Sequence, residues 1–272
     1  DVRGHIVSVS GNIQSLLGYE PEEVYGRVFL QMVRDEDVHL AEEAFTQVLQ
    51  GQSLTEWEVK LMDRNGVEVV TESNVVPVFK NGVVERVLCM SRDISSERQA
   101  EAGMRRAVAK LKRTRDGVIL AMSDVVAARD PYTAAHQTNV VQLAAAIAIE
   151  GGRTEDETEC IRVAAALHDL GKLHIPGETL SKPGRLSDIE FEMIKQHSRA
   201  GFEILRNINF PWPVADIVLQ HHERLDGSGY PLGISGDEIC MEARVLAVAD
   251  VVEAISSHRP YRPALGIERA LL

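Results

Sequence analysis

Hydrophobic and polar positions follow a strand-like pattern in much of the first hundred residues. The runs "LTEWEVKLMD", "VEVVTESNVVPVF" and "VVERVLCMSRDI" have strand character and are joined by the hairpin signals "RNG" and "KNG". The segment "DEDVHLAEEAFTQVLQG" instead has the spacing of an amphipathic helix that ends at Gly51. These patterns predict a mixed α/β domain over residues 1–95, with an antiparallel sheet and flanking helices.

A long helix without proline is predicted from Ser95 to about Ala128. Its apolar positions alternate steps of four and three residues, as in the a and d seam of a coiled coil. The seam comprises Met104, Val108, Leu111, Arg115, Val118, Met122 and Val125. The charged residue in this seam is expected to let the helix splay or change register. The pattern favours a parallel dimeric helix over residues 96–128, and the alternative is an amphipathic helix packed on its own domain.

The rest of the chain has the periodicity of helices only. Segments such as "VVQLAAAIAI", "ECIRVAAALHDL" and "ARVLAVADVVEAISS" are helix-length and repeat apolar residues about every 3.6 positions. Ser187 and Glu190 form a capping box at the start of another helix. Residues 129–272 are therefore predicted to be an all-α domain, which makes the chain a multidomain α+β protein with a connecting helix.

Composition and net charge limit the kinds of protein that this chain can be. The 272 residues are 44% hydrophobic and 26% charged, a globular balance, and the net charge of -12 argues against a nucleic-acid partner. Cys89, Cys160 and Cys240 are widely spaced, so neither a disulfide framework nor a zinc knuckle is indicated. No apolar run reaches the ~18 residues needed to span a bilayer. With no visible signal peptide, we expect a cytoplasmic protein without a membrane segment.

Polar residues that bind metals stand on otherwise apolar helix faces. They are His136, His168, His197, His222 and Asp250. One such histidine alone is more often a hydrogen-bonded core residue than a ligand. Five helices that each direct an imidazole or a carboxylate inward are better explained by metal ions, because a buried unpaired carboxylate is costly.

The types of ligand indicate which metals fit. Imidazoles and carboxylates without a thiolate suit Fe, Mn or Zn better than Mg alone. Five histidines and two aspartates are more ligands than one octahedral ion can bind while it keeps positions open for water and substrate. Two metals sharing Asp169 are the economical arrangement. Such sites hydrolyse phosphoesters by in-line displacement, here with a metal-bridging hydroxide as the expected nucleophile.

The first domain resembles a PAS sensor domain. The matching residues are "LLGYEPEEVYGR", "RDEDVHLAEEAFTQVLQG" and "DRNGVEVVTESNVVPVFKNGVVERVLCMSRDIS". The resemblance implies a sensor but leaves its ligand unknown. His39 stands where haem-binding relatives can carry an axial histidine, and a surface histidine beside acids is the preferred interpretation.

The second domain resembles the HD-GYP subfamily of HD phosphohydrolases. The matching residues include "RDPYTAAHQTNV", "ALHDLGKLHIP", "HHERLDGSGYPLGISGDEI" and "ARVLAVADVVEAISSHRPYRPAL". The resemblance implies metal-dependent hydrolysis of cyclic di-GMP to linear pGpG, and in some members on to GMP, while other members prefer related cyclic dinucleotides. The alternatives are a non-catalytic cyclic dinucleotide receptor and a generic HD nucleotide phosphohydrolase. The complete ligand set argues against the receptor, and the "GSGYP" loop has no role in the generic enzyme.

The resemblance assigns ligands to a centre of two divalent metals. Matching positions are His168, Asp169, His197, His221, His222 and Asp250. His136 is the first histidine of the wider HD pattern, and it would complete this centre or belong to a third site. Members with a third metal have a glutamate where this chain has Tyr132, so a binuclear site is favoured. Fe or Mn is expected, with Zn, Ni or Mg as alternatives.

The resemblance also assigns the catalytic and substrate-binding residues. Asp169 and Lys172 would be catalytic, and Lys172 would neutralise charge on the phosphate; its alternative role is to cap a helix. Arg259 and Arg262 match phosphate-binding positions, although without the motif they would be surface charges. In the loop, Gly229, Tyr230 and Pro231 would shape the pocket and contact substrate, and an ordinary turn is the alternative.

Two residues and the C-terminal end depart from the HD-GYP pattern. Asn139 replaces the usual Arg and Glu253 replaces the usual Asp, and both changes are expected to alter substrate contacts without removing a ligand. The helices expected after "RPAL" are missing, so the domain is expected to be truncated. We expect a PAS signal to act through a homodimeric helix on the enzyme. Signalling partners such as diguanylate cyclase domains are also expected.

Overall fold

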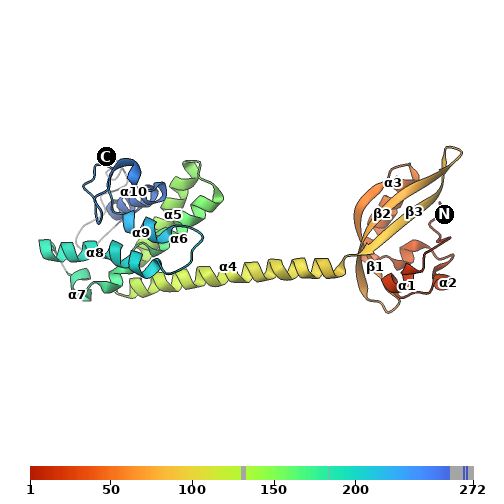
Figure 1. Cartoon of the computed structure of the whole chain (residues 1–272), viewed down its shortest axis with the longest axis horizontal. Coiled ribbons are helices and arrows are strands. Elements are labelled where there is room, and N and C mark those ends of the chain that lie inside the picture. Colours follow the sequence, from red (N-terminus) through yellow and green to blue (C-terminus); the bar gives the residue numbers. More distant parts are fainter. Residues whose placement is uncertain (130–132, 183, 258–265, 267, 269–272) are drawn as a thin grey trace. The chain divides into compact units, whose positions relative to one another are not determined.

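The chain folds into two compact units, residues 1–110 and 111–272. The computed structural model describes residues 1–129, 133–182, 184–257, 266 and 268. Figure 1 shows the elements in chain order. In the part described, no helix combines the length and apolar character required to cross a membrane.

The first unit is built on a three-stranded antiparallel sheet. Its strands β1 (Leu54–Met62), β2 (Glu68–Lys80) and β3 (Val83–Asp93) lie in the order β1-β2-β3. The predicted "KNG" turn joins β2 to β3, and both Asn81 and Gly82 have the positive φ of a type I′ turn, 51° and 82°. Short helices precede the sheet: α1 (Asn12–Leu17), α2 (Pro21–Val24), η1 (Phe29–Met32), η2 (Asp35–Asp37) and α3 (Val38–Leu49). The predicted α/β architecture is confirmed.

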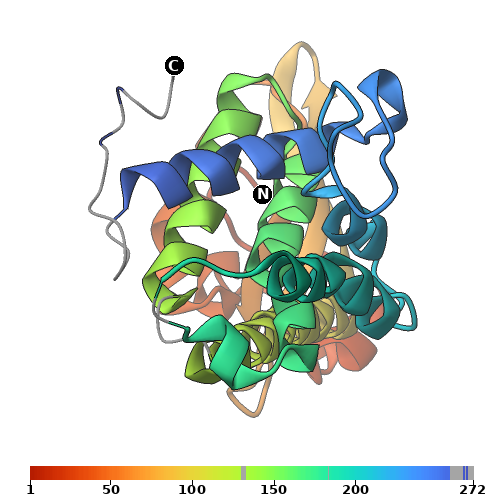
Figure 2. The ribbon, with the colours of Figure 1, turned by 90° about the vertical axis from the view of Figure 1, so that its left-hand side faces the viewer.

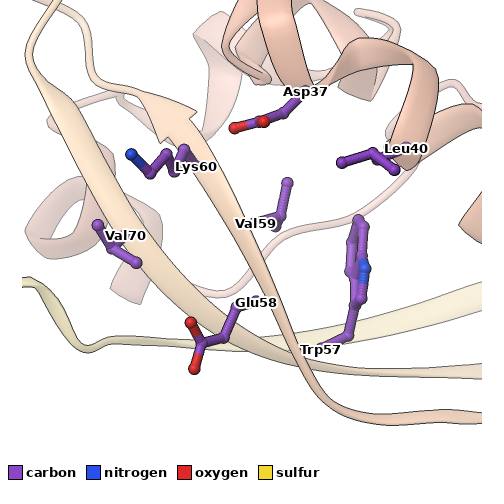
Figure 3. A pocket seen from close by; sticks show the side chains of 7 residues that line it. All are labelled: Asp37, Leu40, Trp57, Glu58, Val59, Lys60 and Val70. Carbon is purple, nitrogen blue, oxygen red and sulfur yellow. The ribbon is translucent and has the colours of Figure 1, made fainter. Parts of the chain in front are cut away.

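One open pocket of about 490 Å³, counted with its solvent-open space, lies between the start of α3 and β1. Figure 3 shows its lining residues, Asp37, Leu40, Trp57, Glu58, Val59, Lys60 and Val70. The charged residues Glu58 and Lys60 already pair with Arg98 and Glu68. The pocket therefore indicates no particular PAS ligand. His39 on α3 is a surface residue, since its side chain is 79% exposed and its Nε2 lies 3.2 Å from Glu43.

A single helix, α4 (Ser95–Arg129), occupies the segment predicted to connect the domains. Most of the predicted apolar seam is exposed: Met104, Val108, Leu111, Val118 and Val125 are each at least 50% exposed.

Arg115, which interrupts the predicted apolar seam, has partners within the second unit. Its guanidinium lies 2.5 Å from Glu159 and 5.9 Å from the ring centroid of Trp212, and Met122 packs against the core of the second unit. Arg115 thus fastens the part of α4 beyond residue 110 to the rest of the second unit.

The second unit is all-α, as predicted. Its helices are α5 (Thr133–Glu150), α6 (Glu155–Leu167), η3 (Leu170–His174), α7 (Gly177–Leu180), α8 (Asp188–Leu205), α9 (Val214–Gln220), η4 (Gly236–Glu238) and α10 (Met241–Ser256). Capping boxes start α6 at Thr154 and α8 at Ser187. Helix α10 crosses α5 and α6, as Figure 2 shows. The core is filled by apolar side chains from these helices, including Ile161, Leu205, Ile217 and Leu246.

Candidate metal centre

Seven predicted ligands converge within the second unit. They come from α5 (His136), the end of α6 and the start of η3 (His168, Asp169), α8 (His197), the end of α9 (His221, His222) and α10 (Asp250). All are buried except His222, which is half-buried. Three overlapping groups have ligand atoms within 4.8 Å of one another: His197–His221–His222, His136–His168–Asp250 and His168–Asp169–His221. Residues far apart in sequence therefore form one polar cluster inside an apolar bundle.

Backbone carbonyls orient three of the imidazoles. Nδ1 of His168, His197 and His221 lies 2.6, 2.7 and 2.6 Å from the carbonyl oxygen three residues earlier. A carbonyl only accepts, so each Nδ1 carries a proton and Nε2 is the nitrogen left to coordinate a metal. This arrangement is typical of histidines that bind metal through Nε2.

The distance between two of these Nε2 atoms fits a shared cation. Nε2 of His197 and Nε2 of His221 are 3.3 Å apart. With both Nδ1 atoms protonated, two lone pairs face each other in a buried site, which is unfavourable without a cation between or beside them. The donor set thus fits divalent metal ions.

The electrostatics of the cluster suit metal binding as well. Burial holds the pKa of His221 well below its usual value and lowers the pKa of His222 to about 4, so both rings are neutral at pH 7. Burial would raise the pKa of Asp169, but the Lys172 ammonium beside it, the largest opposing influence, holds that pKa well below the usual range. The neutral imidazoles of His221 and His222 therefore lie in one cluster with an ionised carboxylate.

A close approach of two backbones places Asp169 beside His197. A Cβ built on Gly171 in η3 would lie 1.8 Å from the carbonyl oxygen of His197, and one on Gly201 in α8 would lie 2.9 Å from Val218. The absence of both side chains lets η3 pack directly on α8, so that Oδ1 of Asp169 lies 3.8 Å from Nε2 of His197. Nothing local in the sequence marks these glycines, because their contact joins segments distant in the chain.

The two residues that depart from the HD-GYP pattern, Asn139 and Glu253, contact each other next to His136. Nε2 of His136 lies 3.1 Å from Oδ1 of Asp250, and its Nδ1 bonds to Glu253. Asn139 in turn donates to Oε1 of Glu253 over 3.1 Å. Among the residues described, Asn139 and Glu253 therefore form a chain that orients a candidate ligand, and their effect on substrate contacts stays a prediction.

A buried glutamate holds the predicted substrate loop. Oε1 of Glu223 accepts hydrogen bonds from the backbone N–H groups of Leu232 and Gly233, at 2.6 and 3.2 Å. A Cβ on Gly229 would lie 2.4 Å from Cα of Glu223, so the loop folds tightly against the end of α9. The ring centroid of Tyr230 lies 4.8 Å from that of His222. Glu223 is not among the predicted site residues, since nothing local in the sequence marks it as buried.

The structure describes some of the predicted substrate-binding residues and not others. Lys172 lies at the centre, with its Nζ 2.8 Å from Oδ2 of Asp169. Gly229, Tyr230 and Pro231 lie in the loop beside His222, and the Tyr230–Pro231 peptide bond is cis. Arg259 and Arg262, together with Tyr132, lie outside the described residues.

Two family models match the chain. One, described as an HD domain, matches residues 121–272, and one described as a PAS fold matches residues 1–99. Both predicted resemblances are thereby confirmed.

Curated relatives are similar to this chain over about half of its length or more. The cyclic di-GMP phosphodiesterase response regulator RpfG of Xanthomonas campestris is 44% identical over 53% of this chain and 38% of its own length. A cyclic di-GMP phosphodiesterase of Thermotoga maritima is 45% identical over 52% of this chain and 39% of its own length. The 3'3'-cGAMP-specific phosphodiesterase 3 of Vibrio cholerae is 37% identical over 57% of this chain and 34% of its own length. The chain thus matches less than two fifths of the length of each of these relatives.

Proposed function

The chain belongs to the HD domain family, and we propose that its second unit is a metal-dependent phosphodiesterase that hydrolyses cyclic di-GMP to linear pGpG. The observation that carries this proposal is the buried cluster of oriented imidazoles and ionised carboxylates. The names of the relatives support the substrate class, because they act on cyclic di-GMP or 3'3'-cGAMP. Further hydrolysis to GMP is compatible with the same chemistry.

The cluster would hold two divalent metals, with Fe or Mn favoured by its nitrogen and oxygen donors. The proposed ligands are His136, His168, Asp169, His197, His221, His222 and Asp250. When bound, such a pair supplies an activated water at neutral pH and neutralises charge on the phosphate. The carbonyl bonds of the histidines keep Nε2 available, and Glu253 holds the His136 ring in place.

Lys172 would help to stabilise the charge that develops on the phosphate. Its ammonium is held beside Asp169 and is only partly buried, so a phosphate oxygen can approach it. We propose Arg259 and Arg262 as further phosphate contacts, on the HD-GYP pattern alone. Tyr230 would form one wall of the pocket, supported by Glu223 and the glycine-containing loop.

Regulation would pass through α4 into the segment that carries the centre. Ser123 Oγ donates to the carbonyl of Ala166 over 2.5 Å, and Arg129 donates to the carbonyl of Leu173 over 2.6 Å. These two bonds flank His168 and Asp169 in sequence. A change in α4 caused by the PAS domain, residues 1–95, would therefore act on the enzyme domain, residues 129–272.

A homodimer through residues 96–128 would follow from the exposed apolar seam of α4. Diguanylate cyclase domains remain proposed signalling partners. We place the reaction in the cytoplasm, because the free cysteines fit a reducing compartment.

Product analysis tests the proposed function. Anaerobic incubation of cyclic di-GMP with the Fe- or Mn-loaded chain should give pGpG, and Asp169→Ala should abolish its formation. Tight binding of uncleaved cyclic di-GMP by the metal-loaded chain would instead support the receptor. Cleavage of mononucleotides in preference to cyclic dinucleotides would support the generic phosphohydrolase.

A further inference from the structure

The first half of α8 carries an aromatic ring and a cation next to the candidate centre. Phe191 and Lys195 are one helical turn apart, and Lys195 precedes the candidate ligand His197 by two residues. Nζ of Lys195 lies 5.3 Å from the ring centroid of Phe191 and 5.7 Å from that of Tyr230. The ammonium group therefore lies near two rings that come from different segments.

The set of two rings and one ammonium lies at the edge of the metal centre, because Tyr230 lies beside a candidate ligand. The Tyr230 ring is tilted by 31° against the ring of His222, with 4.8 Å between the centroids. Phe191 is 48% exposed and the side chain of Lys195 is 23% exposed. A ligand bound at the metals can thus extend onto an accessible ring and meet a positive charge.

An ion pair on α8 does not by itself account for this arrangement. Lys195 pairs with Glu192, whose side chain is 64% exposed. Exposed pairs of this kind contribute roughly 0–1 kcal/mol. An ammonium group has three donors, so the pair with Glu192 leaves the Lys195 ammonium able to donate to a ligand as well.

We propose that Phe191, Lys195 and Tyr230 form a guanine-binding subsite, with Lys195 as its specificity-determining residue. An accessible aromatic face stacks on any base. A lysine ammonium donates well to O6 and N7 of guanine, whereas adenine presents an amino donor in place of O6. Lys195 therefore favours guanine over adenine. The inference rests on the proposed function, since it assigns the base that accompanies the reacting phosphate.

Substrates with different bases test the role of Lys195. The Mn-loaded full chain and Lys195→Met are compared on cyclic di-GMP, 3'3'-cGAMP, cyclic di-AMP and bis(p-nitrophenyl) phosphate, which has no base. We expect kcat/KM for cyclic di-GMP to fall about 5- to 150-fold relative to the baseless substrate. The preference for cyclic di-GMP over cyclic di-AMP should fall with it. An equal loss on all four substrates, or an unchanged preference, overturns the proposal.

Phe191 is tested with matched variants on the same helix. Phe191→Ala should lower kcat/KM for guanine and adenine dinucleotides alike, and Phe191→Tyr should restore it, because stacking does not read the base. Ile189→Ala removes another apolar side chain, which is 76% exposed, and should leave kcat/KM for both kinds of dinucleotide unchanged. Glu192→Gln should leave the preference for guanine in place. Metal content and thermal unfolding exclude a folding defect.

Binding of mononucleotides separates failure of the subsite from failure of the proposed function. The wild type should bind GMP more tightly than AMP, and Lys195→Met should lose this preference, whether or not the chain cleaves a cyclic dinucleotide. Equal binding of both nucleotides by the wild type overturns the subsite. Hydrolysis of bis(p-nitrophenyl) phosphate without hydrolysis of any cyclic dinucleotide contradicts the proposed function instead.

Discussion

Asn139 donates a hydrogen bond to Glu253 over 3.1 Å, and these are the two positions at which the chain departs from the HD-GYP pattern. Glu253 in turn bonds to Nδ1 of His136, whose Nε2 faces Asp250. The pair therefore supports the orientation of a candidate ligand.

Replacing Glu253 tests this chain of contacts. Glu253→Ala removes the acceptor that orients His136, and loss of such an outer contact typically costs 10- to 100-fold in metal affinity. Competition with a chelator followed by metal analysis measures the effect. Asn139→Ala should give a smaller loss in the same direction. Wild-type metal affinity in Glu253→Ala would show that His136 needs no such support.

Gly171→Ala should prevent the close packing of η3 on α8. The new Cβ would lie 1.8 Å from the carbonyl oxygen of His197, so the backbones must separate. We expect a loss of about 3 kcal/mol or more in the free energy of unfolding, together with loss of metal. Gly117→Ala on α4 is the control, because a Cβ there meets nothing within 4 Å, and this change should stabilise the helix by up to about 1 kcal/mol. Equal stability of both variants would contradict the packing argument.

Glu223 offers a comparison between two closely matched variants. Its Oε1 holds Leu232 and Gly233, while its buried Oε2 has no hydrogen-bond partner in the described part of the chain. Glu223→Ala should cost about 1–3 kcal/mol and increase proteolysis of the loop, because two backbone donors lose their acceptor. Glu223→Gln keeps that acceptor and should be close to neutral. If Glu223→Gln were as damaging as Glu223→Ala, the negative charge rather than the hydrogen bonds would be the essential feature.

The metal-free protein should lose stability as the pH falls from about 6.5 towards 4. Burial lowers the pKa of His222 from 6.5 to about 4, so in this window the unfolded state binds more protons than the folded state. The free energy of unfolding therefore decreases with falling pH, by on the order of 3 kcal/mol for His222 alone across the full window. The upper part of this window, above about pH 5.5, lies above the usual carboxylate range.

Urea unfolding of the chelated protein at several pH values measures this dependence. His222→Gln should show a shallower slope between pH 6.5 and 4, because the variant has lost one of the groups that titrate there. His197 and His221, whose pKa values burial also lowers, should maintain the remaining slope. The same slope in His222→Gln and the wild type would show that His222 does not contribute.

Periodicity predicted the two fold classes and five of the candidate ligands, whereas Asp169 and His221 were assigned by the resemblance to the HD-GYP subfamily. Strand alternation and hairpin signals identify the sheet, and His168, His197 and Asp250 stand out because they interrupt apolar helix faces. A polar residue on an apolar face is a local signal that a sequence contains.

Contacts between distant segments carry no such signal. The approach of Gly171 to His197 and the burial of Glu223 depend on how helices pack. The contact of Arg115 with Glu159 joins residues 44 positions apart, and it gives a partner to the residue that interrupts the predicted seam. The roles of these residues depend on contacts between distant segments of the fold.

Metal titration of the chelated chain tests the central claim most directly. Formation of pGpG from cyclic di-GMP is measured anaerobically against added Mn or Fe per chain, for the wild type and Asp169→Ala. The account predicts that activity rises to a maximum at two equivalents in the wild type and stays absent in the variant. Full activity without metal, a maximum at one equivalent, or activity in Asp169→Ala would contradict a two-metal phosphodiesterase.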